Sequence, residues 1–179
     1  MIVDNRVTCT PASTVAAFVA FDKMTGQEIW KSPGVEGQNR SYVSPILAEF
    51  NGKDYILGAS ASDLYIVDPQ NGDIRASYRY FDSSVWTWQP NGMIWANSPV
   101  VKGNMIFLSI GYNYPAKMLK VNDAVSSIEE VYTSELMDNH HHGLIELEGY
   151  LYGSYWISNG SGKWACLDWN TGEVMYDHC

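Results

Sequence analysis

Apolar and polar residues alternate over short stretches of this chain, and no stretch carries apolar residues at a helical spacing. The second repeat is the clearest, with apolar or alternating segments at 42–50, 55–59, 64–67 and 74–80. Tight turns separate these segments at Asn51-Gly52 and at Asp68 to Gly72, because glycine adopts a positive φ and aspartate accepts hydrogen bonds from the amides that follow it. Four short strands joined by such turns predict an antiparallel sheet.

The same order of segments recurs along the chain. The third repeat has predicted strands at 97–101, 105–109, 116–121 and 128–132, and the fourth at 143–147, 150–154, 163–167 and 174–176. The first repeat has only three, at 2–9, 15–21 and 27–30. We therefore expect its innermost strand to be missing.

Each repeat carries an Asp or Asn at one place and usually a Gly four residues later. These residues, together with one tryptophan, are Asp22, Gly26, Trp30, Asp68, Gly72, Asn122, Asp168 and Gly172. The spacing is 46 residues in the first and last intervals and 54 in the middle one, which carries an insertion. A fixed period of this size with four strands per unit is typical of a β-propeller.

The predicted fold is therefore all-β, a β-propeller of four-stranded antiparallel blades. Three whole blades lie at 42–80, 97–133 and 143–177, and an incomplete blade lies at 1–31. Propellers close with about four to eight blades, so this is about half a ring. We expect the remaining blades of a larger propeller, a protein partner, or a second copy in a homodimer to cover the open edges.

Composition excludes several function classes. A net charge of −9 argues against binding nucleic acid or an anionic membrane surface. No apolar stretch reaches the roughly 18 residues of a membrane helix, and the first residues lack the pattern of a signal peptide. Cys9, Cys166 and Cys179 are too few and too scattered to predict a disulfide framework or a zinc knuckle.

The motif Ala20-x-Asp22-x-x-Thr25-Gly26-x-x-x-Trp30 resembles the tryptophan-docking repeat of the pyrroloquinoline-quinone (PQQ)-like propellers. That superfamily holds the quinoprotein dehydrogenases and the BamB-type outer-membrane assembly lipoproteins. The resemblance implies that the repeat tryptophan packs between neighbouring blades against a glycine turn. The equivalent places in the other repeats hold Ala76, Glu130 and Tyr176, which implies that this docking is lost there.

The same resemblance bears on activity and location. The quinone enzymes carry adjacent cysteines, a calcium site of Glu, Asn and Asp, and an aspartate base. This chain has no adjacent cysteine pair, and no acidic residue matches those positions. The resemblance therefore favours a non-catalytic module in the bacterial envelope or periplasm over an enzyme using PQQ and calcium. The alternative is a quinone- or metal-dependent oxidoreductase whose carboxylates lie in blades outside this chain.

Strand order predicts which loops share a face. The connections at 31–41, 81–96 and 134–142 lie on the same face as the loops at 60–63, 111–115 and 156–162. A ligand or partner protein is expected on this face, because a propeller normally binds over its channel. The candidate residues there are Arg40, Trp86, Trp88, Trp95, Asn97, Tyr112, Tyr114, His140, His142 and Trp156.

The aromatic residues of this face support two interpretations. The segment 83–95 could stack on a sugar or a quinone, since aromatic faces bind flat surfaces. It could also plug the channel, and this structural role is favoured because large aromatic residues more often complete a core than form a site. A carbohydrate site formed by Trp86, Trp88 and Trp156 is a further alternative. Arg40 could hold an anionic ligand group or pair with Glu36, and the sequence leaves both open.

Three adjacent histidines at 140–142 are the clearest chemical signal in the sequence, because they could supply metal ligands or a proton acceptor. Neighbouring side chains of an extended segment point to opposite sides, so only His140 and His142 could converge. Zinc needs further ligands that no spacing here supplies. The sequence therefore favours structural or ligand-contact roles over a metal site.

Overall fold

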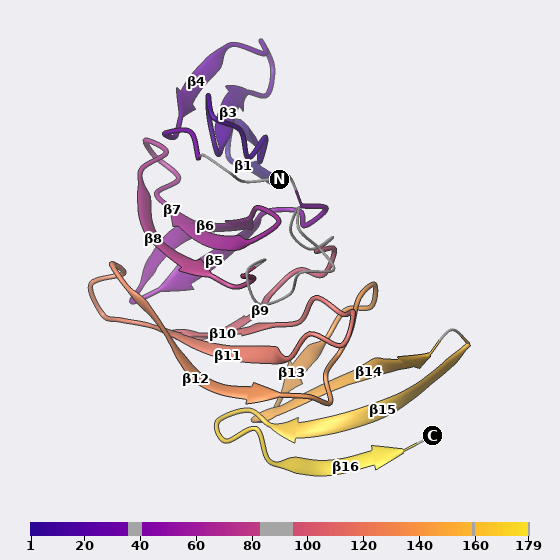
Figure 1. Cartoon of the computed structure of the whole chain (residues 1–179). Helices are drawn as coiled ribbons and strands as arrows, with labels where there is room; N and C mark the ends of the chain where they lie inside the picture. The colour runs from indigo at the N-terminus through magenta and orange to yellow at the C-terminus, as the bar shows by residue number, and fades with distance from the viewer. Residues whose placement is uncertain (36–40, 83–94, 159, 179) are drawn as a thin grey trace. The chain divides into compact units, whose positions relative to one another are not determined.

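The structure is a computed structural model that describes residues 1–35, 41–82, 95–158 and 160–178. Its regular elements are all strands (Figure 1), and none of the described residues belongs to a helix long and apolar enough to cross a membrane. The all-β prediction is therefore confirmed.

The strands form four separate sheets of four antiparallel strands, each in chain order. The first sheet contains β1 (Ile2–Val3), β2 (Arg6–Cys9), β3 (Val19–Asp22) and β4 (Glu28–Lys31). The second contains β5 (Ile46–Phe50), β6 (Lys53–Ala59), β7 (Asp63–Val67) and β8 (Ile74–Arg79). The third contains β9 (Val100–Lys102), β10 (Met105–Leu108), β11 (Ala116–Val121) and β12 (Ile128–Ser134). The fourth contains β13 (Ile145–Leu147), β14 (Tyr150–Ser158), β15 (Ser161–Asp168) and β16 (Val174–His178).

The first sheet differs from the prediction, because it has all four strands. Residues 2–9 form a hairpin rather than one strand, with Ile2 opposite Val7. The chain reverses at Asp4, whose φ is 52°. Aspartate and asparagine tolerate this left-handed conformation, so two polar residues suffice for the turn. The innermost strand is therefore present, although it is only two residues long.

The fourth sheet also differs from the prediction. Residues 156–162 were expected to be a loop, but β14 continues to Ser158 and β15 begins at Ser161. Trp156 pairs with Gly162 across this hairpin, and the register shifts between Trp156 and Ser158. Trp156 therefore projects from a strand and not from the predicted loop.

The chain divides into two compact units, and each has its own core. The first compact unit comprises 1–94 and 122–128, and the second comprises 95–121 and 129–179. Phe18, Ile56 and Val67 are among the fully buried residues of the first unit. Phe107 and Leu167 belong to the core of the second unit.

One aromatic residue fastens the two sheets of the first unit together. Trp30 on β4 donates its indole N–H to the carbonyl oxygen of Pro69 at 3.1 Å. Its ring lies against Gly72, where a Cβ atom would be 2.5 Å from the ring and where φ is +80°. Both the backbone conformation and the ring therefore require glycine at position 72.

A tyrosine makes the corresponding contact in the second unit. Tyr132 on β12 donates its hydroxyl to the carbonyl oxygen of Trp169 at 3.0 Å. A Cβ atom at Gly172, where φ is +73°, would lie 2.7 Å from the Tyr132 ring. Tyr132 follows Glu130 by two residues and so lies on the same face of the strand. The expectation that docking is lost in this repeat was wrong, because the docking residue is displaced along β12.

Candidate functional site

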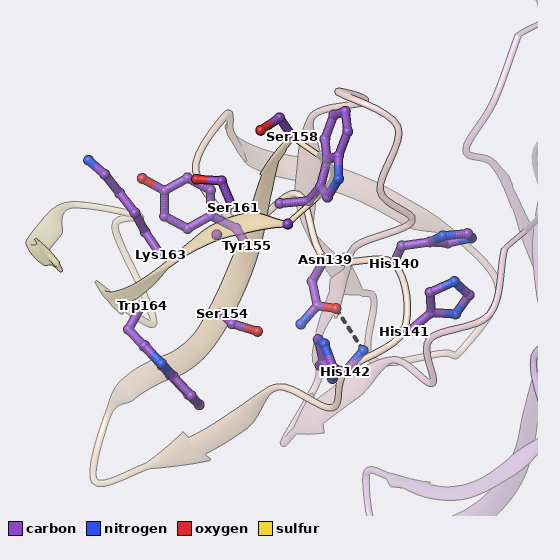
Figure 2. Close-up of a pocket in the computed structure, with 13 residues that line it drawn as sticks. Asn139, His140, His141, His142, Ser154, Tyr155, Ser158, Ser161, Lys163 and Trp164 are labelled. Carbon is purple, nitrogen blue, oxygen red and sulfur yellow. Dashed lines mark hydrogen bonds between the residues drawn. The ribbon is translucent and has the colours of Figure 1, made fainter. Parts of the chain in front are cut away.

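A hollow of about 490 Å³ lies in the second compact unit, beside residues 139–142 and the β14–β15 hairpin. Its lining residues are Asn139, His140, His141, His142, Ser154, Tyr155, Trp156, Ser158, Gly160, Ser161, Gly162, Lys163 and Trp164 (Figure 2). None of these described lining residues is acidic. A second hollow of about 390 Å³ shares His140, His141, Trp156 and Gly160 and adds Tyr112.

Asn139 anchors the segment that forms one wall of the hollow. Its backbone N–H donates to the hydroxyl oxygen of Ser109 at 2.8 Å, immediately after β10. Its carbonyl oxygen accepts hydrogen bonds from Ser109 Oγ and from the side-chain amide of Asn97. All three residues are buried. The wall is thus held by polar contacts between residues more than 25 positions apart, which sequence periodicity does not reveal.

The same contacts orient the side-chain amide of Asn139. Its Oδ1 accepts hydrogen bonds from the backbone N–H of His142 at 2.9 Å and from Asn97 Nδ2 at 3.1 Å. Because Oδ1 faces these donors, Nδ2 faces away from them, toward Ser154 (Figure 2). Nδ2 is buried and has no hydrogen-bond partner in the part of the chain that the structure describes. An unpaired buried donor costs the folded structure about 1–3 kcal/mol.

Asp138 fastens two neighbouring elements to this wall. Its Oδ2 accepts from the backbone N–H of Asn113 at 2.8 Å, and its carbonyl oxygen accepts from the N–H of Trp156 at 2.9 Å. Burial raises the pKa of the Asp138 carboxyl, and the Asn113 hydrogen bond opposes that rise. Its position beneath the wall makes Asp138 a structural residue of the site.

The histidines are arranged differently from the prediction. The segment 140–142 is bent, so side chains do not alternate as in an extended strand. The ring of His140 lies 3.8 Å from that of His141 and 4.3 Å from that of Tyr112, measured between centroids. Gly111 permits this packing, since a Cβ atom there would lie 2.6 Å from His140 Cβ. Within the described ranges, no group of three or more His, Cys, Asp or Glu could hold a metal ion.

The other predicted site residues have different environments. Trp95 and Tyr114 are buried, and Asn97 supports Asn139 instead of facing solvent. Trp156 lines the hollow and is 40% exposed, which leaves part of its indole surface available. Arg40, Trp86 and Trp88 lie outside the described residues.

Sequence reasoning missed the part of the hollow that the hairpin supplies. Ser154 and Trp164 pair across β14 and β15, and Trp164 is 64% exposed. The Lys163 ammonium pairs with Asp177 at 3.1 Å, and Tyr155 donates its hydroxyl to the same carboxylate at 2.5 Å. Both hydrogen bonds lower the pKa of the Asp177 carboxyl, and the one from Tyr155 has the larger effect. The signal that could have found this wall is the apolar, aromatic-rich run at 150–157, which continues past the predicted end of the strand at 154.

The residues of this site do not fit a PQQ and calcium pair. Calcium takes carboxylate and carbonyl oxygens, whereas the described lining supplies imidazole, amide, hydroxyl and indole groups. No adjacent cysteine pair is present in the sequence.

Comparison with known proteins identifies the fold. No family model and no curated protein matches this sequence. Among solved structures, a quinohemoprotein alcohol dehydrogenase from Comamonas testosteroni matches with a TM-score of 0.60 and 13% identity, over 89% of this chain and 34% of that one. A europium-containing methanol dehydrogenase matches with a TM-score of 0.45 and 14% identity, over 76% of this chain and 26% of that one. The chain thus spans about a third of the first protein, and its fold is that of part of a β-propeller.

Proposed function

We propose that this chain is a non-catalytic binding module that holds its ligand in the hollow beside 139–142 and the β14–β15 hairpin. The observation that carries the proposal is the indole of Trp156, which is 40% exposed within the hollow and projects from the paired strand β14. An aromatic side chain held on a paired strand favours binding, because little of its conformational freedom remains to be lost when a ligand binds.

The chemistry of the lining indicates a neutral ligand rich in hydroxyl groups. Ser154 and Ser161 offer hydroxyls, and Trp156 offers an exposed aromatic face. Aromatic faces bind the apolar faces of sugar rings, and short polar side chains bind their hydroxyls. We therefore propose an envelope carbohydrate as the ligand, with a protein partner over the same face as the competing occupant.

The proposal also includes the location of the protein in the bacterial envelope and its relationship to one group of propeller proteins. The Asp22 to Trp30 motif and the propeller fold support a BamB-type scaffold or a PQQ-binding-like protein of the bacterial envelope. Fractionation of cells that produce the protein would test the location. Recovery with cytosolic proteins alone would contradict it.

A quinone-dependent oxidoreductase is the competing function, since the fold is shared with a quinohemoprotein alcohol dehydrogenase. In that case the catalytic carboxylates would come from parts of a longer protein. Titration of the complete protein with PQQ and Ca²⁺ separates the two functions. We expect no change in quinone absorbance, and a saturable calcium-dependent change would favour the enzyme.

A glycan array followed by calorimetric titration tests the binding proposal directly. We expect at least one neutral glycan to bind, and Trp156→Ala to weaken its binding about tenfold or more because the stacking surface is lost. Tyr42→Ala is the matched control, since Tyr42 is a 70% exposed aromatic residue of the first compact unit. Equal binding by wild type and Trp156→Ala, or no bound glycan, would refute the proposal.

A further inference from the structure

The two aromatic docking contacts have the same form. In each, an aromatic residue on the outermost strand of one sheet lies against the glycine of a turn in the next sheet. Trp30 also donates to the carbonyl of Pro69, and Tyr132 to the carbonyl of Trp169. Each acceptor directly follows the repeat aspartate, at 68 or 168. The contact therefore needs an aromatic donor, a glycine at positive φ and one carbonyl oxygen.

The turn at 22–26 is built like the turn at 168–172. Asp22 Oδ1 accepts from the N–H groups of residues 24 and 25 and from the hydroxyl of Thr25, and Asp168 Oδ1 accepts the equivalent three hydrogen bonds. Gly26 and Gly172 have φ values of +72° and +73°. A Cβ atom at Gly172 would strike Tyr132, but one at Gly26 meets no described atom within 4 Å. The turn at 22–26 thus has the form of a docking site with no aromatic residue on it in the described structure.

Tyr176 has the position of a docking donor. It lies on β16, the outermost strand of the fourth sheet, and pairs with Cys166 as Trp30 pairs with Ala20. Its side chain is 42% exposed, and its ring stacks on His178 at 5.3 Å. An aromatic residue in the register of Trp30 is therefore presented on the surface.

The sheet face around Tyr176 is apolar and exposed. Register places Ile145 and Tyr176 on one face, along with Trp164. Ile145 and Trp164 are each 64% exposed. Large apolar side chains gathered on one face of a sheet indicate an interaction surface.

The first sheet offers a complementary face. Phe21 precedes Asp22 as Val67 precedes Asp68 and Leu167 precedes Asp168. Val67 and Leu167 are completely buried in their cores, whereas Phe21 is only half-buried, and Ile2 on the same face is 66% exposed. The face that receives a neighbouring sheet elsewhere in the chain is thus largely open here.

We propose that two copies of this chain associate head to tail, with Tyr176 of one copy docked on the turn at 22–26 of the other and donating to its Lys23 carbonyl. Both halves of the contact belong to this chain and match two contacts already present within it, which favours a second copy as the occupant. The contact joins two different surfaces, so a closed dimer uses both surfaces of each copy. This inference does not depend on the proposed ligand.

Light scattering over a concentration series tests the contact. We expect the wild type to approach twice the chain mass of 20.1 kDa. Tyr176→Ala and Gly26→Asn should each weaken association about tenfold or more, since one removes the docked ring and the other fills its site. Asparagine tolerates a positive φ, so the turn at 22–26 is retained. Gly103→Asn is the matched control, because Gly103 has a φ of +55° with open space around its Cβ position.

Mixing the two variants makes the test specific. Tyr176 of the Gly26→Asn chain can dock on Gly26 of the Tyr176→Ala chain, so a mixture keeps one intact contact and should have a higher average mass than either variant alone. Both variants should keep the wild-type circular dichroism, because Tyr176 is exposed and Gly26 meets no described side chain. A monomeric wild type, an association that neither variant weakens, or a mixture no heavier than its components would overturn the proposal.

Discussion

Gly172→Ala tests whether Tyr132 docking stabilises the second compact unit. A Cβ atom at position 172 would lie 2.7 Å from the Tyr132 ring, at a φ of +73°. The positive φ costs an alanine about 1–2 kcal/mol. Displacing the ring adds about 1–3 kcal/mol, the usual cost of overpacking. We therefore expect the free energy of unfolding to fall by about 2–5 kcal/mol.

The same substitution in a Tyr132→Ala background should cost only about 1–2 kcal/mol, because only the backbone term remains. The difference between the two backgrounds is the coupling energy of the pair. Hydrogen exchange of the β15 amides is the appropriate assay, since it reports the stability of this unit. Gly103→Ala, at a φ of +55° with open space around it, is the control and should cost the backbone term alone. Equal costs of Gly172→Ala in the two backgrounds would refute the docking argument.

Three further predictions follow from buried polar groups and from the first docking contact. Burial raises the folded pKa of Asp138 above its ordinary 3.8, so the native state retains a proton that the unfolded state releases. Wild-type stability should therefore fall relative to Asp138→Asn as the pH rises from below 3.8 through the folded pKa, and parallel melting-temperature curves would contradict this. Ser109→Ala should cost about 0.5–1.5 kcal/mol in urea denaturation, because the hydroxyl's hydrogen bonds to the backbone of Asn139 are lost while the Asn139 N–H keeps the Met137 carbonyl. Trp30→Phe should cost about 1–3 kcal/mol by hydrogen exchange of the β7 amides, since the Pro69 carbonyl loses its donor and the smaller ring leaves a gap. Unchanged exchange would show that the contact does not stabilise the first unit.

The candidate site was only partly predictable. The sequence pointed to 138–142 and to Trp156, because histidine runs and tryptophans are conspicuous wherever they fold. It did not indicate Ser154 or Trp164, since the length of β14 and β15 depends on their pairing with each other. The orientation of the Asn139 side chain could not be predicted from the sequence either, because it depends on a hydrogen bond from Asn97, 42 residues away.

The sequence alone determined the fold class, because the features that specify strands and turns are local. The alternation of apolar residues and the Asp and Gly turns at 22–26, 68–72 and 168–172 act within a few residues, so sheets and turns could be predicted without tertiary contacts. Only the tertiary structure decided which aromatic residues join the sheets. Trp30 reaches 39 residues forward to Pro69, and Tyr132 reaches 37 residues forward to Trp169. Such contacts depend on how one sheet lies on the next, and a ring displaced by two residues along a strand can still reach its glycine.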